Sequence, residues 1–252
     1  MLRLGSRVGR PLLLKTVDRG LARKATAEGV GTAMLVAVVV GSGIFAQRLS
    51  PGDGGLQLLE NSVATGAGLI ALILAFGAVS GAHFNPVVSL ADRILGGLTT
   101  RELAAYVPAQ VVGGCAGAVI ANLMFDLPAV TLSTHARSAG GLWLGEVVAT
   151  FGLLTVILGV VRSGRTSAAP FAVGAYIAAA YWFTSSTSFA NPAVTLARML
   201  TDTFAGIEPS SAPAFVVAQV AGAAVAIALA RFLHPDLPAE EVVMPHPDEE
   251  RS

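Results

Sequence analysis

Residues 80–87 read Ser80-Gly81-Ala82-His83-Phe84-Asn85-Pro86-Val87, and the Asn-Pro pair in this stretch returns once, at Asn191-Pro192-Ala193. Only four asparagines occur in the chain, and two of them precede proline in this way. Asparagine is a strong N-cap and proline is favoured at the first position of a helix. The two pairs therefore predict two helices with the same kind of beginning, one in each half of the chain.

The composition around these pairs is typical of a membrane protein. Hydrophobic residues make up 54% of the 252 residues and charged residues only 13%, with a mean hydropathy of +0.69. A soluble domain carries about 25% charged residues. A helix that crosses the ~30 Å hydrocarbon core of a bilayer needs about 20 apolar residues. Six segments reach that length, near residues 27–47, 61–80, 102–125, 141–161, 168–186 and 212–233. We therefore predict an all-α membrane protein with six transmembrane helices.

The two helices that follow the Asn-Pro pairs are too short to cross a membrane. Apolar sequence runs for ten residues from Pro86 to Leu95 and for nine from Pro192 to Leu200, and ten residues make about 15 Å of helix. Irregular backbone at mid-membrane depth is tolerated only where it is buried in protein or lines a cavity. The sequence thus predicts two re-entrant half-helices whose N-termini meet at a central pore.

The chain also repeats itself. Glu28 opens a Glu-Gly-Val-Gly-Thr motif that matches the motif beginning at Glu146, and Ala-Gln-Val-Val-Gly around Gln110 matches the sequence around Gln219. Each half contains three spans, so the second half enters the membrane upside down relative to the first, as in other inverted-repeat proteins. The halves are about 25–125 and 141–233, within one channel domain, 25–233.

Basic residues set the expected orientation. The first 24 residues carry seven basic residues and one acid, which places this end in the cytoplasm. Six spans return the acidic, proline-rich segment 234–252 to the same side, and we expect that tail to be disordered. The sequence thus predicts a multi-pass protein of the cell membrane with both termini cytoplasmic. The single cysteine, Cys115, excludes an internal disulfide.

Two half-helices with facing N-termini favour uncharged solutes. Each N-terminus carries roughly half a positive charge, which repels cations and hydronium in the lumen. The amides of Asn85 and Asn191 can cap their helices through oxygen while offering N–H donors to a solute. A neutral hydroxylated molecule exchanges hydrogen bonds with water for these donors, whereas an ion loses much more hydration than it regains.

On these motifs the chain resembles the aquaporin and aquaglyceroporin family, the major intrinsic proteins, over about residues 25–233. The resemblance implies six spans with two half-helices and a homotetramer in the lipid bilayer with one pore per subunit. It also implies passive conduction of small neutral solutes, with no cofactor, no metal and no nucleic acid. The sequence holds no Ser/His/Asp set, metal-ligand cluster or phosphate-binding loop, so we do not expect an enzyme.

Departures from the family pattern fall at its selectivity filter. Where the family usually carries arginine, three residues after the second asparagine, this chain has Val194. The other filter positions fall at Thr65, Ser188 and Ala179, and the last of these could slip to Ile177 or Tyr176. Small, uncharged residues here predict a wide filter. The first motif also ends in Val87 rather than alanine, as in metalloid-permeable relatives. We therefore expect a channel for metalloid hydroxides such as arsenous acid, with glycerol, other small polyols or water as alternatives.

Four further residues are ionisable and lie in or near the predicted pore. Glu28 and Glu146 lie within spans, where they either accept hydrogen bonds from the re-entrant loops or couple solute movement to protons. The first role is structural, and the second would make the chain an inverted-repeat secondary transporter. His83 is a candidate for the inner vestibule or a hydrogen-bonded loop residue. Arg198, one turn beyond Val194, lines the outer vestibule or reaches the lipid headgroups.

Overall fold

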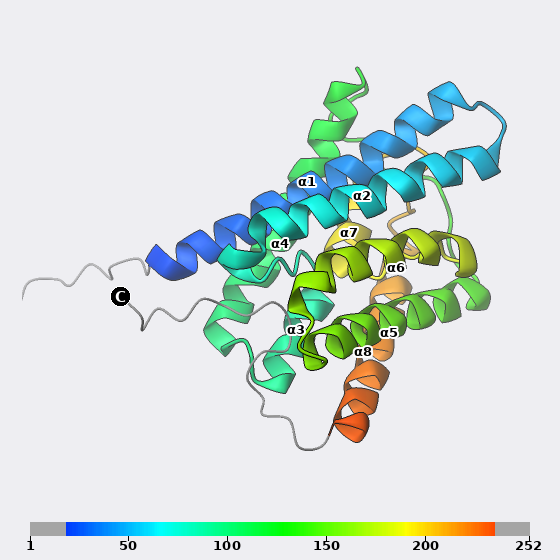
Figure 1. Ribbon diagram of the computed structural model, residues 1–252. Helices are drawn as coiled ribbons and strands as arrows, with labels where there is room; N and C mark the ends of the chain where they lie inside the picture. Colours follow the sequence, from blue (N-terminus) through cyan, green and yellow to red (C-terminus); the bar gives the residue numbers. More distant parts are fainter. Residues whose placement is uncertain (1–18, 235–252) are drawn as a thin grey trace, which may run out of the picture.

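The computed structural model describes residues 19–234, and that part of the chain is helical, with no strand (Figure 1). The expected N-terminal segment 1–24 and tail 234–252 lie largely outside it; residues 19–24 belong to the first helix. The long helices and the short ones that interrupt them are, in chain order, α1 (Arg19–Leu49), α2 (Gly54–Ser80), α3 (Pro86–Leu95), α4 (Thr100–Met124), α5 (Gly140–Arg162), α6 (Ala169–Phe183), α7 (Pro192–Ala197) and α8 (Ala212–Leu233). Two 3-10 turns, η1 (Thr166–Ala168) and η2 (Arg198–Leu200), precede α6 and follow α7.

Five of these helices, α1, α2, α4, α5 and α8, are long and apolar enough to cross a membrane. The six predicted spans correspond in chain order to α1, α2, α4, α5, α6 and α8, although α1 and α2 begin earlier than expected. Large apolar side chains lie exposed on the outside of the described bundle, and Val112 and Val217 are 69% and 70% exposed. Such a surface is unfavourable in water and suits lipid.

The remaining span, expected at 168–186, is shorter in the structure. Helix α6 has 15 residues, about 22 Å, and η1 extends it by about 6 Å at its beginning. It ends at Phe183 because the backbone of Thr184 turns to an extended conformation, φ −103° and ψ 137°. The residues after Thr184 are therefore free to form the second re-entrant loop.

Small residues allow the long helices of each half to approach closely. A Cβ atom at Gly113 of α4 would overlap the carbonyl oxygen of Gly29 in α1, and one at Gly117 would overlap that of Ala33. In the second half, a Cβ atom at Gly222 of α8 would overlap the backbone of Val147 in α5. This is the backbone-to-backbone packing by which helices associate in lipid.

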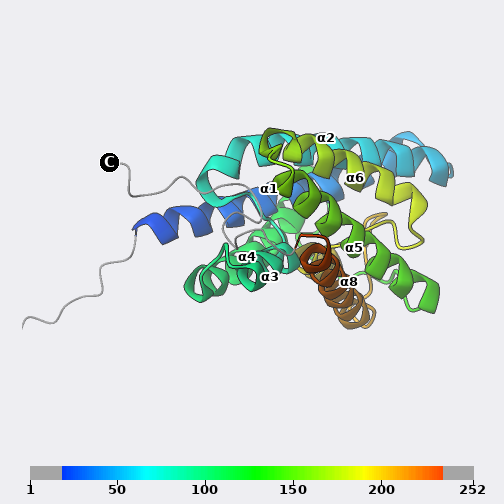
Figure 2. The ribbon, with the colours of Figure 1, turned by 60° about the horizontal axis from the view of Figure 1, so that its bottom comes forward.

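The two short helices pack against the long ones, α3 against α4 and α8, and α7 against α4, α8 and α1. Figure 1 labels both short helices, and Figure 2 shows α3 beside α4. Helix α3 has the predicted bounds, and α7 with η2 spans the nine residues expected from Pro192 to Leu200. Each begins as predicted, with an asparagine N-cap followed by proline. The prediction of an all-helical inverted repeat with two half-helices is confirmed.

Candidate solute pore

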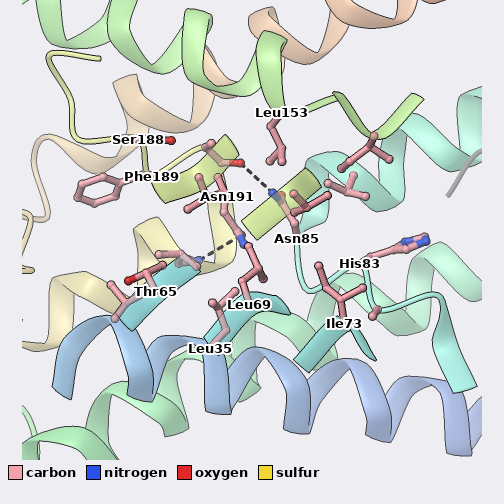
Figure 3. A pocket seen from close by; sticks show the side chains of 18 of the residues that line it. Leu35, Thr65, Leu69, Ile73, His83, Asn85, Leu153, Ser188, Phe189 and Asn191 are labelled. Atoms are coloured by element: carbon pink, nitrogen blue, oxygen red, sulfur yellow. Dashed lines mark hydrogen bonds between the residues drawn. The ribbon is translucent and has the colours of Figure 1, made fainter. Parts of the chain in front are cut away.

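The two asparagines join the half-helices at the centre of the molecule (Figure 3). The Oδ1 of Asn85 accepts from the N–H of Val87 at 3.1 Å, and the Oδ1 of Asn191 accepts from that of Ala193 at 3.0 Å. Each side-chain amide also donates across the centre at 2.8 Å, Asn85 to the carbonyl of Ala190 and Asn191 to that of Phe84. An amide group has two donor hydrogens, so each asparagine keeps one for a solute.

Glu28 supports the first loop. Its carboxylate accepts hydrogen bonds from the backbone N–H groups of His83 and Phe84 at 2.9 and 2.7 Å. The hydroxyl of Ser80 and the amide of Gln110 donate to it as well, at 2.6 and 2.8 Å. The side chain is fully buried, so these four donors supply the stabilisation that water would otherwise give the carboxylate.

Glu146 does the same for the second loop. It accepts from the N–H groups of Phe189 and Ala190 at 2.8 and 2.9 Å and from the amide of Gln219 at 2.6 Å. These contacts support the interpretation of both glutamates as structural residues, since each carboxylate is occupied by the loop that it holds.

The loop backbones repeat the same conformation. Left-handed φ values occur one and three residues before each asparagine, at Phe84 and Ala82 (50° and 52°) and at Ala190 and Ser188 (48° and 52°). Non-glycine residues adopt this region infrequently. Four such residues at matched positions indicate that the glutamates and asparagines hold both loops in one geometry.

A narrow cavity, with a volume of about 70 Å³ available to water-sized molecules, follows the two loops through the bundle. One side of it is apolar, with side chains from α1, α2, α5 and α6 such as Leu35, Leu69, Ile73, Leu153 and Val173. The other side carries the re-entrant loops with both asparagines. Thr65, Tyr181 and Arg198 line one end, which we call the Arg198 mouth, and Gly81, His83 and Val161 line the other, the His83 mouth.

Three of the four expected filter residues, Thr65, Ser188 and Val194, line this cavity. The fourth, Ala179, does not, and that expectation is wrong. Ala179 is exposed on the outer face of α6, whereas the cavity is lined by Val173, Ile177 and Tyr181, which lie four residues apart on one helix face.

Tyr181 is the residue of α6 at the level of Thr65, since the two hydroxyls lie 3.2 Å apart. The alternative position Tyr176 packs sideways on α5, where its hydroxyl donates to the carbonyl of Ala149 at 3.1 Å. Ile177, the other alternative, does line the cavity.

Arg198 is buried, with 2% of its surface exposed, and lines the cavity. Its Nε donates to the carbonyl of Ala205, and its guanidinium carbon lies 3.4 Å from the centre of the Phe189 ring. The structure therefore supports the vestibule interpretation over an arginine that reaches the headgroups. Neither Phe189 nor Arg137, whose guanidinium carbon lies 5.0 Å from the same ring, was expected at this mouth.

His83 lines the opposite mouth. Its Nδ1 lies 3.0 Å from the hydroxyl of Ser89, and its Nε2 lies 3.4 Å from a carboxylate oxygen of Asp92. Both side chains are buried. Both interpretations of His83 therefore apply at once, because it is hydrogen-bonded within the loop and also borders the cavity.

Comparisons with known proteins agree with this geometry. The profile of the family described as Major intrinsic protein matches residues 15–189 and 165–249. The chain is 54% identical over 213 residues to the aquaglyceroporin AqpS of Rhizobium meliloti (strain 1021), covering 84% of this chain and 91% of that protein. It is 34% identical to the glycerol uptake facilitator protein of Pseudomonas aeruginosa, over 60% of this chain and 63% of that one.

Among solved structures, the X-ray structure of the aquaglyceroporin from Plasmodium falciparum superimposes with a TM-score of 0.68, at 22% identity. It covers 85% of this chain and 98% of that one, and at this identity the likeness concerns the fold. Taken with the paired asparagines and the cavity between them, the profile match and the 54% identical relative show that the chain belongs to the major intrinsic protein family, a family of passive channels for small solutes and not of enzymes.

Proposed function

We propose that this channel conducts small uncharged hydroxylated solutes, and metalloid hydroxides such as arsenous acid in particular. One observation carries the proposal: an uncharged Val194 lines the cavity at the filter position where the family usually carries arginine. Because position 194 itself carries no guanidinium, the hydroxyl-bearing residues Thr65, Ser188 and Tyr181 line the cavity together with this valine. Hydroxyl groups both donate and accept, so they suit a solute that consists largely of hydroxyls.

The two sides of the cavity support the same solute class. The asparagine amides provide donors along one side, and the apolar side provides no partner for the hydration shell of an ion. An ion would therefore lose hydration without compensation, whereas a neutral hydroxylated molecule can be passed from donor to donor.

Glycerol or another small polyol is the second candidate. An amphipathic solute with a carbon chain suits a lumen that is apolar on one side, with Leu35, Ile73 and Leu153, and polar on the other. The identity with a glycerol uptake facilitator adds to this candidate. Water passage is compatible with either solute.

We further infer that the His83 mouth faces the cytoplasm, that the protein lies in the cell membrane and that it forms a homotetramer. The orientation is supported by the basic residues near the start of α1, since positively charged flanks remain on the cytoplasmic side. The tetramer is supported by family membership.

The test is uptake of arsenous acid into proteoliposomes without any ion gradient, for the native chain and for Val194→Arg. We expect uptake well above that of empty liposomes, reduced at least tenfold by the substituted guanidinium because it narrows and charges the neutral level of the pore. Val194→Leu is the matched control; it adds volume without charge and should reduce uptake much less.

The same vesicles are then used for glycerol and water swelling. Arsenous acid uptake no faster than in empty liposomes, with folded protein present, would refute the metalloid proposal. Swelling in glycerol under those conditions would favour the polyol candidate.

A further inference from the structure

The Arg198 mouth contains two arginines on one aromatic ring. The guanidinium carbons of Arg198 and Arg137 lie 3.4 and 5.0 Å from the centre of the Phe189 ring. Within residues 19–234, neither arginine forms an ion pair with a carboxylate. Two cations thus share one π system, which attracts each of them but does not neutralise them.

Arg198 is held in a fixed position. Its Nε donates to the carbonyl of Ala205, and its own carbonyl accepts from the N–H of Ile207 at 3.3 Å. No other residue of the described chain accepts a hydrogen bond from its terminal amino groups, although the side chain is 98% buried and borders the cavity. Those groups remain available to whatever enters the mouth.

Arg137 reaches the ring from the loop between α4 and α5. Its Nε donates to the carbonyl of Gly206 at 3.1 Å, and its backbone N–H donates to the hydroxyl of Ser211 at 2.9 Å. It does not line the cavity. It therefore adds a second positive charge behind Phe189 without taking up space in the lumen.

The inverted repeat places a contact at the same positions in both halves. Phe189 and Arg198 stand two residues before and seven residues after Asn191, and His83 and Asp92 stand at the same distances from Asn85. The two residues touch in both halves, His83 and Asp92 with an N···O distance of 3.4 Å. The fold thus places the imidazole of His83 and the carboxylate of Asp92 together in the first half, and the ring of Phe189 and the guanidinium of Arg198 together in the second.

We propose that Arg198, held against Phe189 one helical turn beyond Val194, is the cation-excluding residue of this channel. Val194 carries no charge with which to repel cations, and Arg198 supplies that positive charge at the end of the cavity. Cations that enter here meet a fixed positive charge beside Thr65 and Tyr181, while the uncharged Val194 one helical turn away leaves the lumen open to uncharged solutes. The inference rests on the proposed function only in that the chain forms a pore for small solutes.

The experiment compares cation leak with neutral-solute flux in proteoliposomes. Proton and methylammonium entry are measured with an internal pH dye at a fixed potassium diffusion potential, and arsenous acid and glycerol fluxes are measured in the same preparation. Arg198→Gln should raise the ratio of cation entry to neutral flux at least tenfold, because the charge is lost. Arg198→Lys, which keeps the charge, should raise it less than threefold. Arg137→Gln should fall between the two.

The matched control is Arg48→Gln. Arg48 lies 5.1 Å from the Phe125 ring and donates to the carbonyl of Phe125 at 2.6 Å, but it is exposed and does not border the cavity. Its replacement should leave the ratio unchanged. An equal ratio for native protein and Arg198→Gln would overturn the proposal, as would equal leak through the Lys and Gln variants.

A second variant guards against loss of the fold in Arg198→Gln. Phe189→Leu removes the ring against which the Arg198 guanidinium packs. We expect a smaller rise of the ratio, about threefold, and no rise would count against the proposal. The cation measurement does not depend on which neutral solute permeates. Failure of arsenous acid uptake therefore remains distinguishable from failure of the cation barrier.

Discussion

The two re-entrant halves of this channel agree in their support and differ at their mouths. In both halves, a buried glutamate accepts hydrogen bonds from backbone N–H groups of the loop. An asparagine caps its own half-helix and donates a hydrogen bond to a carbonyl of the other loop. In the first half the two side chains at the mouth are His83 and Asp92; in the second they are Phe189 and Arg198. The repeat is preserved where backbone must be satisfied inside a membrane, and it diverges where a solute enters.

The reason for this division is energetic. An unsatisfied backbone group in hydrocarbon is very unfavourable, so residues that satisfy the loops have few substitutes. The side chains at the mouths do not accept hydrogen bonds from the loop N–H groups, which the glutamates hold, so they can differ between the halves while both loops keep one geometry. We therefore expect differences in solute selection to follow the mouths rather than the Asn-Pro motifs.

The largest expected effect comes from breaking the shared support. Glu28→Ala leaves four donors without their acceptor, and Glu146→Ala leaves three. Each buried unsatisfied group costs about 1–3 kcal/mol, so both variants should fail to give folded protein, Glu28→Ala more completely. The measurement is the monodisperse fraction in detergent by size-exclusion chromatography.

Glu28→Gln keeps one acceptor oxygen and should recover part of that fraction. Folded, conducting Glu28→Ala would show that the loop does not depend on this carboxylate.

Much of this architecture could be predicted from the sequence because its signals are local. An asparagine cap followed by proline fixes where a half-helix begins, and the apolar run that follows fixes its length. Both half-helices therefore have the expected bounds. A structural role for the glutamates could be proposed from the sequence, because a buried carboxylate beside a re-entrant loop has few roles other than accepting hydrogen bonds from it, and their contacts support that role.

The filter residue of α6 could not be predicted in the same way. Helix α6 is apolar on all sides, so its periodicity does not indicate which face meets the lumen. The register is fixed by tertiary contacts, such as that between Tyr181 and Thr65. Arg137 lies in a loop without any periodic pattern, and only folding brings it to Phe189. One signal for Phe189 was present: it stands two residues before its asparagine, as His83 does.

An intermediate effect on stability is expected when His83 is replaced by phenylalanine, the residue at the matching position, Phe189, in the second half. His83→Phe leaves the buried carboxylate of Asp92 without the neighbouring imidazole and should destabilise the protein by about 3 kcal/mol. Replacing both partners, as in His83→Phe/Asp92→Leu, should recover at least ~1 kcal/mol, because an apolar pair leaves no buried charge. Thermal unfolding in detergent measures both, with Asp92→Leu as the single control. A double variant no more stable than His83→Phe would show that the two side chains are not coupled.

The smallest effect concerns the one shared left-handed position of the two loops at which the first loop carries glycine and the second does not. Gly81 and Thr187 both lie four residues before their asparagines, with φ of 82° and 62°. Glycine adopts this region freely, whereas a β-branched residue is strained there. Gly81→Ala should therefore destabilise the folded protein by about 1–2 kcal/mol, a fall in Tm of roughly 2–8 °C for a chain of this size.

Thr187→Gly relieves a similar strain but adds freedom to the unfolded chain, which offsets about 0.4–1 kcal/mol of the gain. It should leave Tm unchanged or slightly higher, and a clear fall would mean that the Thr187 side chain stabilises the second loop in a way that Gly81 does not stabilise the first.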